Sequence, residues 1–340
     1  MKRCIQLAKN GLGTTYPNPL VGSVIVHNNT IIGEGWHYKA GHPHAEVNAV
    51  HSVQDTSQLS DATIYVSLEP CSHFGKTPPC ADLIIEKGIK KVMIGTTDPN
   101  PKVAGQGIKK LMEAGCDVAV GILESECNEL NKRFFTFQQK QRPYLILKWA
   151  ETADGFIAPK TRNAQKPVWI TNEFSRQLAH KLRAEEQAIL VGTNTVKEDN
   201  PSLTTRDWQG NHPLRIILDR KNILDKDFAV FNKRSDTLLL TEQPGKDFEG
   251  TSFETIVFDQ HLASSICDVL YRKSIQSLVV EGGTKTLQTF IDANLWDEAF
   301  VFEGKSIFRE GVKAPVFNGT LLKQNNIADN ILYHYKNTSH

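Results

Sequence analysis

One histidine and two cysteines flank a short apolar segment in the first quarter of the chain, and this arrangement restricts the fold more than any other feature. The histidine stands in the run Pro43-His44-Ala45-Glu46, while Cys71 and Cys80 each follow a proline. Residues 62–68 between them read Ala-Thr-Ile-Tyr-Val-Ser-Leu, which is typical of a buried strand. A helix is predicted over 45–53. We therefore expect helix or loop starts to converge around the histidine and the cysteines.

The residue types at this point predict a metal site. One histidine and two cysteines are good ligands for Zn²⁺, and a catalytic zinc site keeps its fourth position for water. Glu46 follows His44 by two residues and is not needed as a ligand, so we expect it to carry protons. The pattern indicates a zinc-dependent deaminase of nucleobase-like rings. A structural cluster is the alternative, and His42 and His73 are rival ligands without a glutamate at the same offset.

Length and charge predict two globular domains in the cytoplasm. The chain has 340 residues, which is long for one domain, and its 39 basic and 38 acidic residues leave a net charge of +1. A nearly neutral chain without basic–aromatic clusters is not expected to bind nucleic acid. Neither a membrane-spanning apolar run nor a signal-peptide pattern is present, so no membrane association is expected. The cysteines outside the metal motif stand singly and are expected to be reduced.

Strands alternate with helices along the whole chain, which predicts a layered α/β fold. In the first half, strands are predicted over 21–26, 31–36, 62–68, 91–95 and 116–120, and helices over 1–11, 45–53, 81–87, 108–113 and 123–137. In the second half, strands are predicted over 144–149, 187–191, 214–219, 236–241, 255–257, 277–281 and 298–302, and helices over 261–273 and 284–293. A polar stretch before Pro143 marks the boundary between domains 1–142 and 143–340. The chain starts inside its first helical pattern, which suggests that residues precede Met1.

The second half carries a weaker signal for an anion site. The apolar strand 277–281 runs into Gly282 and Gly283 and then a helix. Backbone amides at such a helix start can bind phosphate, and glycines allow close approach. An ordinary strand-to-helix turn is the alternative, because the run matches neither common phosphate-binding motif. Arg183 and Arg206 are candidates to hold a phosphate, with solvated surface charge as the alternative.

Taken together, the motifs resemble those of the bifunctional deaminase–reductase of riboflavin biosynthesis over nearly the whole chain. The matching motifs are Thr15-Tyr-Pro-Asn-Pro19, His44-Ala-Glu46, the block Cys71 to Cys80, Asp98-Pro-Asn-Pro101 and the block from Leu182-Arg-Ala184 to Arg206. Eight residues separate the two cysteines, whereas the general deaminase motif has two. The resemblance implies a cytidine-deaminase-like three-layer domain followed by a dihydrofolate-reductase-like α/β domain.

The resemblance also implies two reactions. The first domain would hydrolytically deaminate 2,5-diamino-6-ribosylamino-4(3H)-pyrimidinone 5′-phosphate. The second would reduce the ribosyl group of the product to ribityl with NADPH. His44, Cys71 and Cys80 match the ligands of one zinc ion per chain, and Glu46 matches the proton donor.

Further positions match contacts to cofactor and substrate. The cofactor positions are Ala150, Trp169, Thr195, Asp199, Gly283, Thr284, Lys285, Thr286, Leu287, Gln288 and Thr289. The substrate positions are Arg183, Leu203, Arg206 and Glu281, with Lys148 as a candidate partner near the reacting sugar. Asn18, held between two prolines, is a candidate partner of a polar ring, and a purely structural turn is its alternative.

Two departures from the family pattern leave an alternative open for the second domain. Pro167 stands where a substrate-binding serine is usual, and Arg220 stands where a cofactor-contacting serine is common. A deaminase joined to an inactive reductase domain that serves as a scaffold is therefore one alternative.

A nucleic-acid deaminase that carries a binding domain is a second alternative for the whole chain, and the nearly neutral net charge opposes it. The resemblance implies a homo-oligomer.

Overall fold

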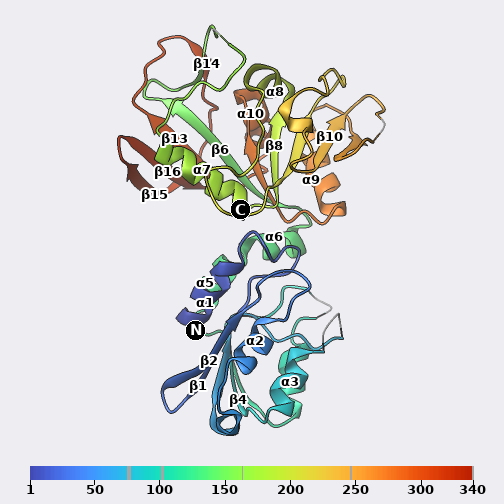
Figure 1. The fold of residues 1–340 in the computed structure, drawn as a ribbon, viewed down its shortest axis with the longest axis vertical. Coiled ribbons are helices and arrows are strands. Elements are labelled where there is room, and N and C mark those ends of the chain that lie inside the picture. The colour runs from blue at the N-terminus through green and yellow to red at the C-terminus, as the bar shows by residue number, and fades with distance from the viewer. Residues whose placement is uncertain (75–77, 101–102, 163, 246, 339–340) are drawn as a thin grey trace. The chain divides into compact units, whose positions relative to one another are not determined.

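The computed structural model describes residues 1–74, 78–100, 103–162, 164–245 and 247–338, and it divides into two units, Met1–Gln141 and Arg142–His340. Residues 75–77 of the spacer between the cysteines lie outside the described residues, as do residues 101–102 of the Asp98-Pro-Asn-Pro motif. None of the described helices has the length and apolarity needed to cross a membrane. Figure 1 shows both units and labels many of their elements.

In its described part, the first unit is built on a sheet with the strand order β2-β1-β3-β4-β5. Its strands are β1 (Gly22–His27), β2 (Thr30–Trp36), β3 (Thr63–Val66), β4 (Lys91–Ile94) and β5 (Asp117–Val120). The strands β2, β1 and β3 pair antiparallel, and β3, β4 and β5 pair parallel. Asn28 and Asn29 form the hairpin turn between β1 and β2 with φ angles of 47° and 59°, which asparagine tolerates well.

Helices cover both faces of this sheet, so the first unit has the three layers predicted. Its helices are α1 (Lys2–Ala8), η1 (Lys9–Gly11), α2 (Ala45–His51), η2 (Thr56–Asp61), α3 (Cys80–Glu86), α4 (Gln106–Glu113), α5 (Glu124–Leu130) and α6 (Lys132–Lys140). Ile64 and Val66 of β3 belong to the core cluster shared with α2, α3 and α4. Tyr65, on the other face, packs against the cluster of Cys4 and Leu7 in α1.

The prediction of one helix over 123–137 is wrong, because the structure has α5 and α6 with Asn131 between them. The side chain of Asn131 is buried and bonds to the backbone of Leu20, accepting its N–H at 2.8 Å and donating to its carbonyl at 2.9 Å. The side chain of Asn131 thus satisfies the backbone hydrogen-bonding groups of a residue distant in the chain, and the helix is interrupted at this position.

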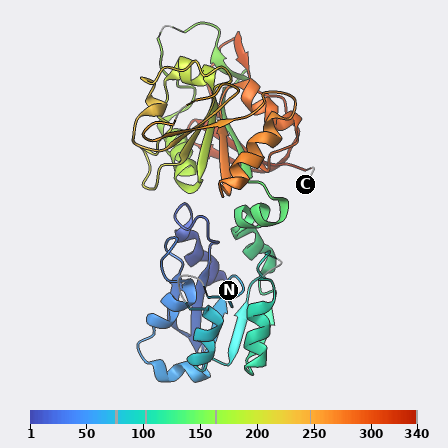
Figure 2. The ribbon, with the colours of Figure 1, turned by 90° about the vertical axis from the view of Figure 1, so that its right-hand side faces the viewer.

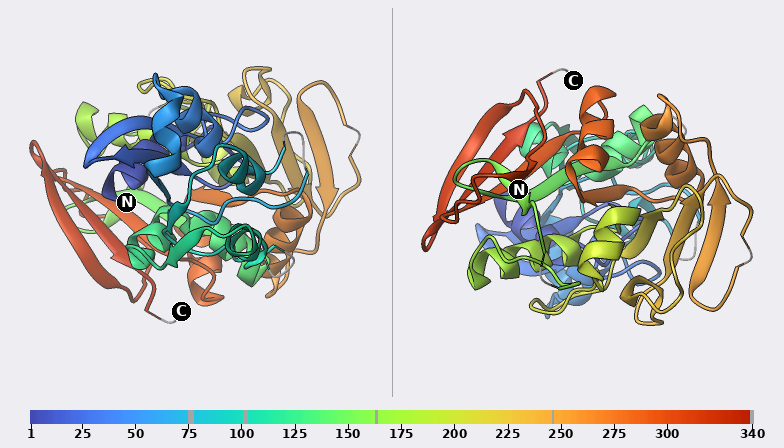
Figure 3. Two further views of the ribbon diagram at one scale, coloured as in Figure 1. Left: turned by 90° about the horizontal axis from the view of Figure 1, so that it is seen from below. Right: turned by 90° about the horizontal axis from the view of Figure 1, so that it is seen from above.

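The described part of the second unit contains a larger sheet with the order β11-β10-β9-β8-β12-β6-β13-β16-β15. Its strands are β6 (Tyr144–Thr152), β8 (Ala188–Gly192), β9 (Leu214–Leu218), β10 (Thr237–Thr241), β11 (Thr251–Thr255), β12 (Ser277–Glu281), β13 (Glu298–Gly304), β15 (Thr320–Ile327) and β16 (Asn330–Lys336). In the part of this order from β11 to β13, all neighbouring strands pair parallel. The strands β15 and β16 form an antiparallel hairpin, and β16 pairs antiparallel with β13. Figure 3 shows this red hairpin and the light-orange β10 and β11 at opposite edges of the sheet. A separate ribbon pairs β7 (Phe156–Pro159) with β14 (Gly311–Lys313).

Helices also lie on both faces of the larger sheet. They are α7 (Glu173–Glu185), α8 (Thr193–Asp199), η3 (Ala229–Phe231), α9 (Leu262–Arg272) and α10 (Thr284–Asp292). The apolar side chains of α9 and α10 share a core cluster with Leu147 and Val280 of the central strands. Leu182 of α7 packs against Ile146 and Val279, which face the other way. Figure 2 shows the orange α9 and α10 on one side and the yellow-green α7 on the other.

Several elements of the second unit differ from prediction, and β7, α8 and β14 are among those not predicted. Helix α7 is unpredicted, because its buried residues Ser175, Ala179, His180 and Ala184 are small or polar and form no apolar stripe. The strand predicted over 255–257 ends where it was expected to begin, since β11 pairs with β10 over Thr251–Thr255. In the polar tail the sequence predicts one short strand at Ile331-Leu-Tyr333, whereas the structure has the two long strands β15 and β16.

A buried ion pair fixes the start of β6. Arg142 donates from Nη1 and Nη2 to the carboxylate of Asp297 at 2.6 and 2.8 Å, and the N–H of Leu145 donates to the same carboxylate at 2.8 Å. Both charged side chains are 8% exposed. Because loss of one partner would leave a buried charge, the pair holds the first strand of the unit against the segment before β13.

Candidate metal centre and second-unit cavity

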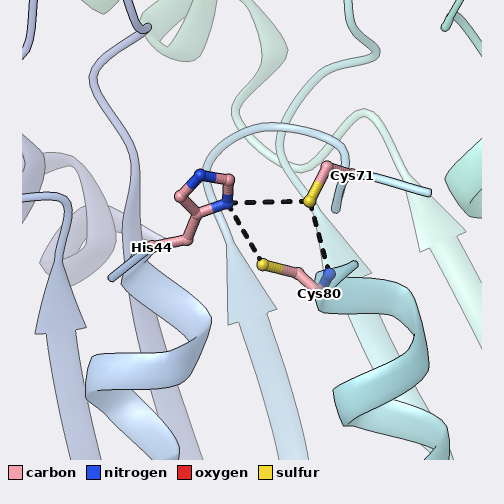
Figure 4. A group of neighbouring side chains, drawn as sticks. All are labelled: His44, Cys71 and Cys80. Carbon is pink, nitrogen blue, oxygen red and sulfur yellow. Dashed lines mark hydrogen bonds between the residues drawn. The ribbon is translucent and has the colours of Figure 1, made fainter. Parts of the chain in front are cut away.

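The three predicted metal ligands converge where two helices begin and one loop passes (Figure 4). His44 is the N-cap residue of α2, Cys80 is the first residue of α3, and Cys71 follows β3 in a loop. His44 Nδ1 lies 3.6 Å from Cys71 Sγ and 3.3 Å from Cys80 Sγ. Two ligands of one tetrahedral zinc ion, at usual Zn–N and Zn–S lengths, lie about 3.6 Å apart. Among the described residues, these three form the group whose donor atoms lie within 4.8 Å of one another, which excludes His42 and His73 from it.

The electrostatics of the two thiols also fit a metal. A hydrogen bond from the Cys80 thiol, helped by His44, lowers the pKa of Cys71 to about 4, although burial opposes the shift. The Cys71 sulfur also accepts the backbone N–H of Cys80 at 3.3 Å. The pKa of Cys80 is raised, because its thiol donates to Cys71 and because it is buried. The Cys71 thiolate, the Cys80 sulfur and the His44 imidazole together form a set of donor atoms that suits zinc.

Glu46 lies beside this group without belonging to it. It occupies the first turn of α2 and is 3% exposed. Burial, followed by the nearby charge of Cys71, raises the pKa of its carboxyl group to about 7. Glu46 is therefore a titratable carboxyl group next to the three metal ligands, and it is not one of those ligands.

His37 is a neighbour of the site that the sequence analysis missed. It is 3% exposed, and its ring centroid lies 5.4 Å from that of His44 at an angle of 79°. Its Nε2 lies 3.0 Å from Nδ2 of Asn18, and its Nδ1 lies 3.1 Å from the carbonyl oxygen of Pro43. An imidazole that accepts from the amide and donates to the carbonyl satisfies both contacts. The structure thus places Asn18 next to the metal site, and a histidine directly after strand β2 was the available signal for His37.

Glu69 is a second residue that the sequence analysis missed. Its carboxylate is 6% exposed and accepts four backbone N–H groups at 2.9–3.3 Å. The donors belong to Asp98, Gly105, Gly107 and Ile108. Helix α4 comes this close because Gly107 has no side chain, and a Cβ there would lie 2.0 Å from the carbonyl oxygen of Pro70. Glu69 therefore ties the loop before α4 to the segment that carries Cys71.

The second unit contains a cavity of about 660 Å³ at the carboxyl ends of β6, β8, β9 and β12. Ligands of open parallel sheets bind at this end of the strands. The predicted residues that line the cavity are Lys148, Ala150, Trp169, Arg183, Thr195, Asp199, Leu203, Arg206, Glu281, Gly283, Thr284, Lys285, Thr286 and Thr289. Pro167 and Arg220, the two departures from the family pattern, line it as well.

Two residues of the predicted cofactor segment do not line the cavity. Leu287 is fully buried in the core cluster of α9 and α10. Gln288 donates to Asp292 at 2.7 Å and to the carbonyl oxygen of Val316 at 3.1 Å. Their side chains are thus committed to packing and to hydrogen bonds within the unit.

A buried charged triad stands in the cavity. Arg183 pairs with Glu281 through Nε and Nη2, and Lys148 Nζ lies 3.5 Å from the same carboxylate. Burial by itself raises the pKa of Glu281, but the charges of Arg183 and Lys148 outweigh it and hold the pKa at about 2. Burial lowers the pKa of Lys148, and Glu281 partly opposes that shift. The site therefore holds an ionised carboxylate between two nitrogen donors.

Arg206 and Asp199 have different surroundings. Arg206 donates from Nη1 to the hydroxyl of Ser202, and it is exposed. Asp199 pairs with Arg162, whose Nε also lies 3.2 Å from Glu198. Arg162 comes from the segment after β7 and was not predicted at the site. Arg206 therefore presents its charge to the cavity, whereas Asp199 is already paired.

Comparisons with known proteins agree with these two sites. The family model of the cytidine and deoxycytidylate deaminase zinc-binding region matches residues 1–96, and the model of the RibD C-terminal domain matches residues 143–325. The fold and the metal site thus define a zinc-binding deaminase unit followed by a reductase unit.

Individual relatives extend the match to the whole chain. The riboflavin biosynthesis protein RibD of Aquifex aeolicus is 42% identical, over 92% of this chain and 88% of the relative. RibD of Synechocystis is 40% identical, over 94% and 87%. A solved Thermotoga maritima structure, described as a diaminohydroxyphosphoribosylaminopyrimidine deaminase/5-amino-6-(5-phosphoribosylamino)uracil reductase, superposes with a TM-score of 0.90 at 40% identity, covering 99% of this chain and 97% of that one.

The chain belongs to the RibD family of bifunctional deaminase–reductases of riboflavin biosynthesis. The predicted family, fold class and paired activities are confirmed. The prediction that His44, Cys71 and Cys80 form a zinc-binding site is confirmed as well. The reductase unit implies NADPH as cofactor.

Proposed function

We propose that this chain carries out two consecutive reactions on one pyrimidine ribosyl phosphate. The unit with the metal site, Met1–Gln141, deaminates the diaminopyrimidinone, and the unit with the cavity, Arg142–His340, reduces the ribosyl group of the product to ribityl with NADPH. The observation that carries the proposal is the coexistence in one chain of a histidine–cysteine donor group beside a buried glutamate and a cavity at the ends of parallel strands.

The deamination replaces an exocyclic amine by oxygen and releases ammonia. Zinc, when bound by His44, Cys71 and Cys80, supplies a Lewis acid that activates water. Glu46 is the buried carboxyl group beside these ligands, and we assign it the transfer of protons to the ring nitrogen and the departing amine. We assign Asn18, whose Nδ2 lies 3.0 Å from His37 Nε2, to the polar edge of the ring.

Glu46→Gln tests the proton transfer. We expect the variant to keep one zinc ion per chain and to lose deamination by about a hundredfold or more, because general acid–base catalysis contributes at least that much. Metal analysis and ammonia release provide the two measurements. Glu86→Gln on the exposed side of α3 is the control and should leave both unchanged. Full deamination by the Glu46 variant would reject the assignment.

The reduction delivers a hydride and a proton to the sugar. NADPH would supply the hydride, and we assign its pyrophosphate to the backbone amides at the start of α10, which lines the cavity. Lys148 is the buried ammonium group next to Glu281, and we assign it the proton. Arg206, whose guanidinium has no carboxylate partner within 4 Å among the described residues, is assigned to the substrate phosphate.

Arg206→Ala tests the phosphate assignment. A contact made equally in the ground and transition states changes KM rather than kcat, so we expect a raised KM for the deaminated substrate with little change in kcat. Arg234→Ala removes an exposed arginine outside the cavity and is the control. An unchanged KM in the Arg206 variant would remove this residue from the substrate site.

One assay tests both halves together. The purified, zinc-loaded protein receives the diaminopyrimidinone ribosyl phosphate as sole substrate, and ammonia release and NADPH oxidation are followed in the same tube. Loss of NADPH shows that both units work in sequence. Ammonia without NADPH oxidation would favour the alternative of an inactive reductase unit. We further propose that the enzyme acts in the cytoplasm and that it is a homo-oligomer. Sedimentation of the purified protein tests the oligomeric state.

A further inference from the structure

Arg220 stands at one end of the cavity on a rigid turn. It follows β9, and its carbonyl oxygen accepts the N–H of Glu242 at 3.0 Å. The carboxylate of the preceding residue, Asp219, accepts the N–H groups of Ile223 and Leu224 at 2.8 Å each. The backbone on both sides of Arg220 is thus held, while its side chain is 58% exposed and lines the cavity.

The guanidinium of Arg220 is oriented but not saturated. Its Nε donates to one carboxylate oxygen of Glu242 at 2.8 Å, and the other oxygen of Glu242 accepts the N–H of Phe258 at 2.9 Å. Among the described residues, Glu242 is the one hydrogen-bonding partner of this guanidinium. Both terminal amino groups therefore remain to bind an anion, and arginine binds phosphate best in this two-pronged manner.

The order of the strands decides which part of a dinucleotide reaches Arg220. Strands β9, β8, β12 and β6 are successive neighbours, so at about 4.8 Å per strand β9 lies about 14 Å from β6. Lys148 and Glu281 mark the β6 and β12 end of the cavity, and α10 follows β12 with Gly283 as its N-cap residue. A dinucleotide with its nicotinamide near Lys148 and its pyrophosphate at α10 extends its adenosine half toward β9.

The β9 end of the cavity suits adenosine. Phe258 and Leu262 line the same cavity as Arg220 and offer apolar surface to a purine ring. NADPH carries a phosphate on the 2′-oxygen of its adenosine ribose, and NADH does not. We infer that Arg220 binds this 2′-phosphate and makes the reductase selective for NADPH over NADH. The inference rests on the proposed use of NADPH by this cavity.

Calorimetric titration of the full-length, zinc-loaded protein with NADPH, NADH and 2′,5′-ADP tests the inference without substrate. We expect Arg220→Ser to weaken binding of NADPH and 2′,5′-ADP by about ten- to a hundredfold, the usual effect of losing hydrogen bonds to a charged group. Binding of NADH should stay within about twofold. Arg220→Lys keeps the charge and should lose less. Lys221→Ser removes a neighbouring positive charge outside the cavity and should leave all three titrations unchanged.

Two results would overturn the inference while leaving the proposed function intact. In the first, Arg220→Ser binds NADPH as tightly as the unaltered chain. In the second, it weakens NADPH and NADH equally, which would place Arg220 at a part of the cofactor that both share. An unaltered chain that binds neither dinucleotide would instead overturn the assignment of NADPH to this cavity, and the inference with it.

Discussion

Arg183 and Glu281 form a two-pronged ion pair inside the cavity, with hydrogen bonds of 3.0 and 2.7 Å, although they lie 98 residues apart in the chain. Their side chains are 11% and 10% exposed. The two arginines considered for the phosphate are therefore not equivalent. Arg183 holds a buried carboxylate in its ionised form, and Arg206 remains available for a ligand.

Loss of Arg183 should destabilise the second unit. Arg183→Ala leaves the carboxylate of Glu281 buried with Lys148 alone, and we expect the free energy of unfolding to fall by about 3 kcal/mol. Denaturant titration followed by tryptophan fluorescence measures this unit, because four of the five tryptophans lie in it. Lys181→Ala on the same helix, with a side chain 43% exposed, is the control. Equal midpoints for both variants would contradict a stabilising role for the pair.

His180 should make the stability of the second unit depend on pH. Its Nδ1 accepts the N–H groups of Arg206 and Asp207 at 2.9 Å each, which requires the ring to be unprotonated at that atom. Burial, together with the charges of Arg183 and Arg206, lowers its pKa to about 4 from an ordinary 6.5, while Asp207 and Glu281 oppose the shift. The unfolded chain therefore binds the proton first. The stabilisation is complete above pH 6.5 and is lost as the pH falls to about 4, with an upper limit of about 3 kcal/mol.

His180→Asn separates this titration from the others. The amide oxygen of asparagine replaces Nδ1 as acceptor and does not titrate, so the unfolding free energy should change less between pH 4 and pH 6.5 than in the unaltered chain. His261→Asn, at an exposed position before α9, is the matched control. An identical pH slope in all three proteins would show that His180 does not govern it.

Glu69 should control the order of the loop before α4. The carboxylate of Glu69 accepts four backbone N–H groups, and Glu69→Gln removes its negative charge. The NH₂ group of the glutamine replaces one accepting oxygen, so some of the four N–H groups lose their acceptor. We expect faster hydrogen exchange at Gly105, Gly107 and Ile108, and a loss of stability of the first unit of about 3 kcal/mol. Glu113→Gln, exposed on the same helix, should leave exchange unchanged. Protection that survives in the Glu69 variant would mean that α4 packing alone orders the loop.

Removal of zinc should abolish deamination and leave the reductase unit able to bind NADPH. Cys80→Ser, or a chelator applied to the unaltered chain, should abolish metal content and deamination. NADPH binding should persist, because the two units have separate hydrophobic cores. Calorimetric titration with NADPH before and after chelation provides the measurement, and Cys116→Ser, away from the donor group, provides the control. Parallel loss of NADPH binding would show that the units depend on each other.

The sequence alone determined the features that depend on short spacing and residue chemistry. The strand 277–281 has the apolar centre Leu-Val-Val, and the structure contains that strand with the same bounds. The zinc ligands were found because few side chains bind zinc and their order around a strand is distinctive. Helix α7 was missed because the surface it buries is small and polar, a pattern that hydrophobic periodicity does not reveal.

Only the tertiary structure decided which distant side chains meet. The contact of Asn18 with His37, the four amides on Glu69 and the pairing of Arg183 with Glu281 all join segments brought together by strand order. A buried polar group must find a partner, but the sequence does not say which of many compatible partners the sheet will place beside it. Local pattern therefore predicted the strands and the metal ligands, and the packing of strands and helices determined the network that orients them.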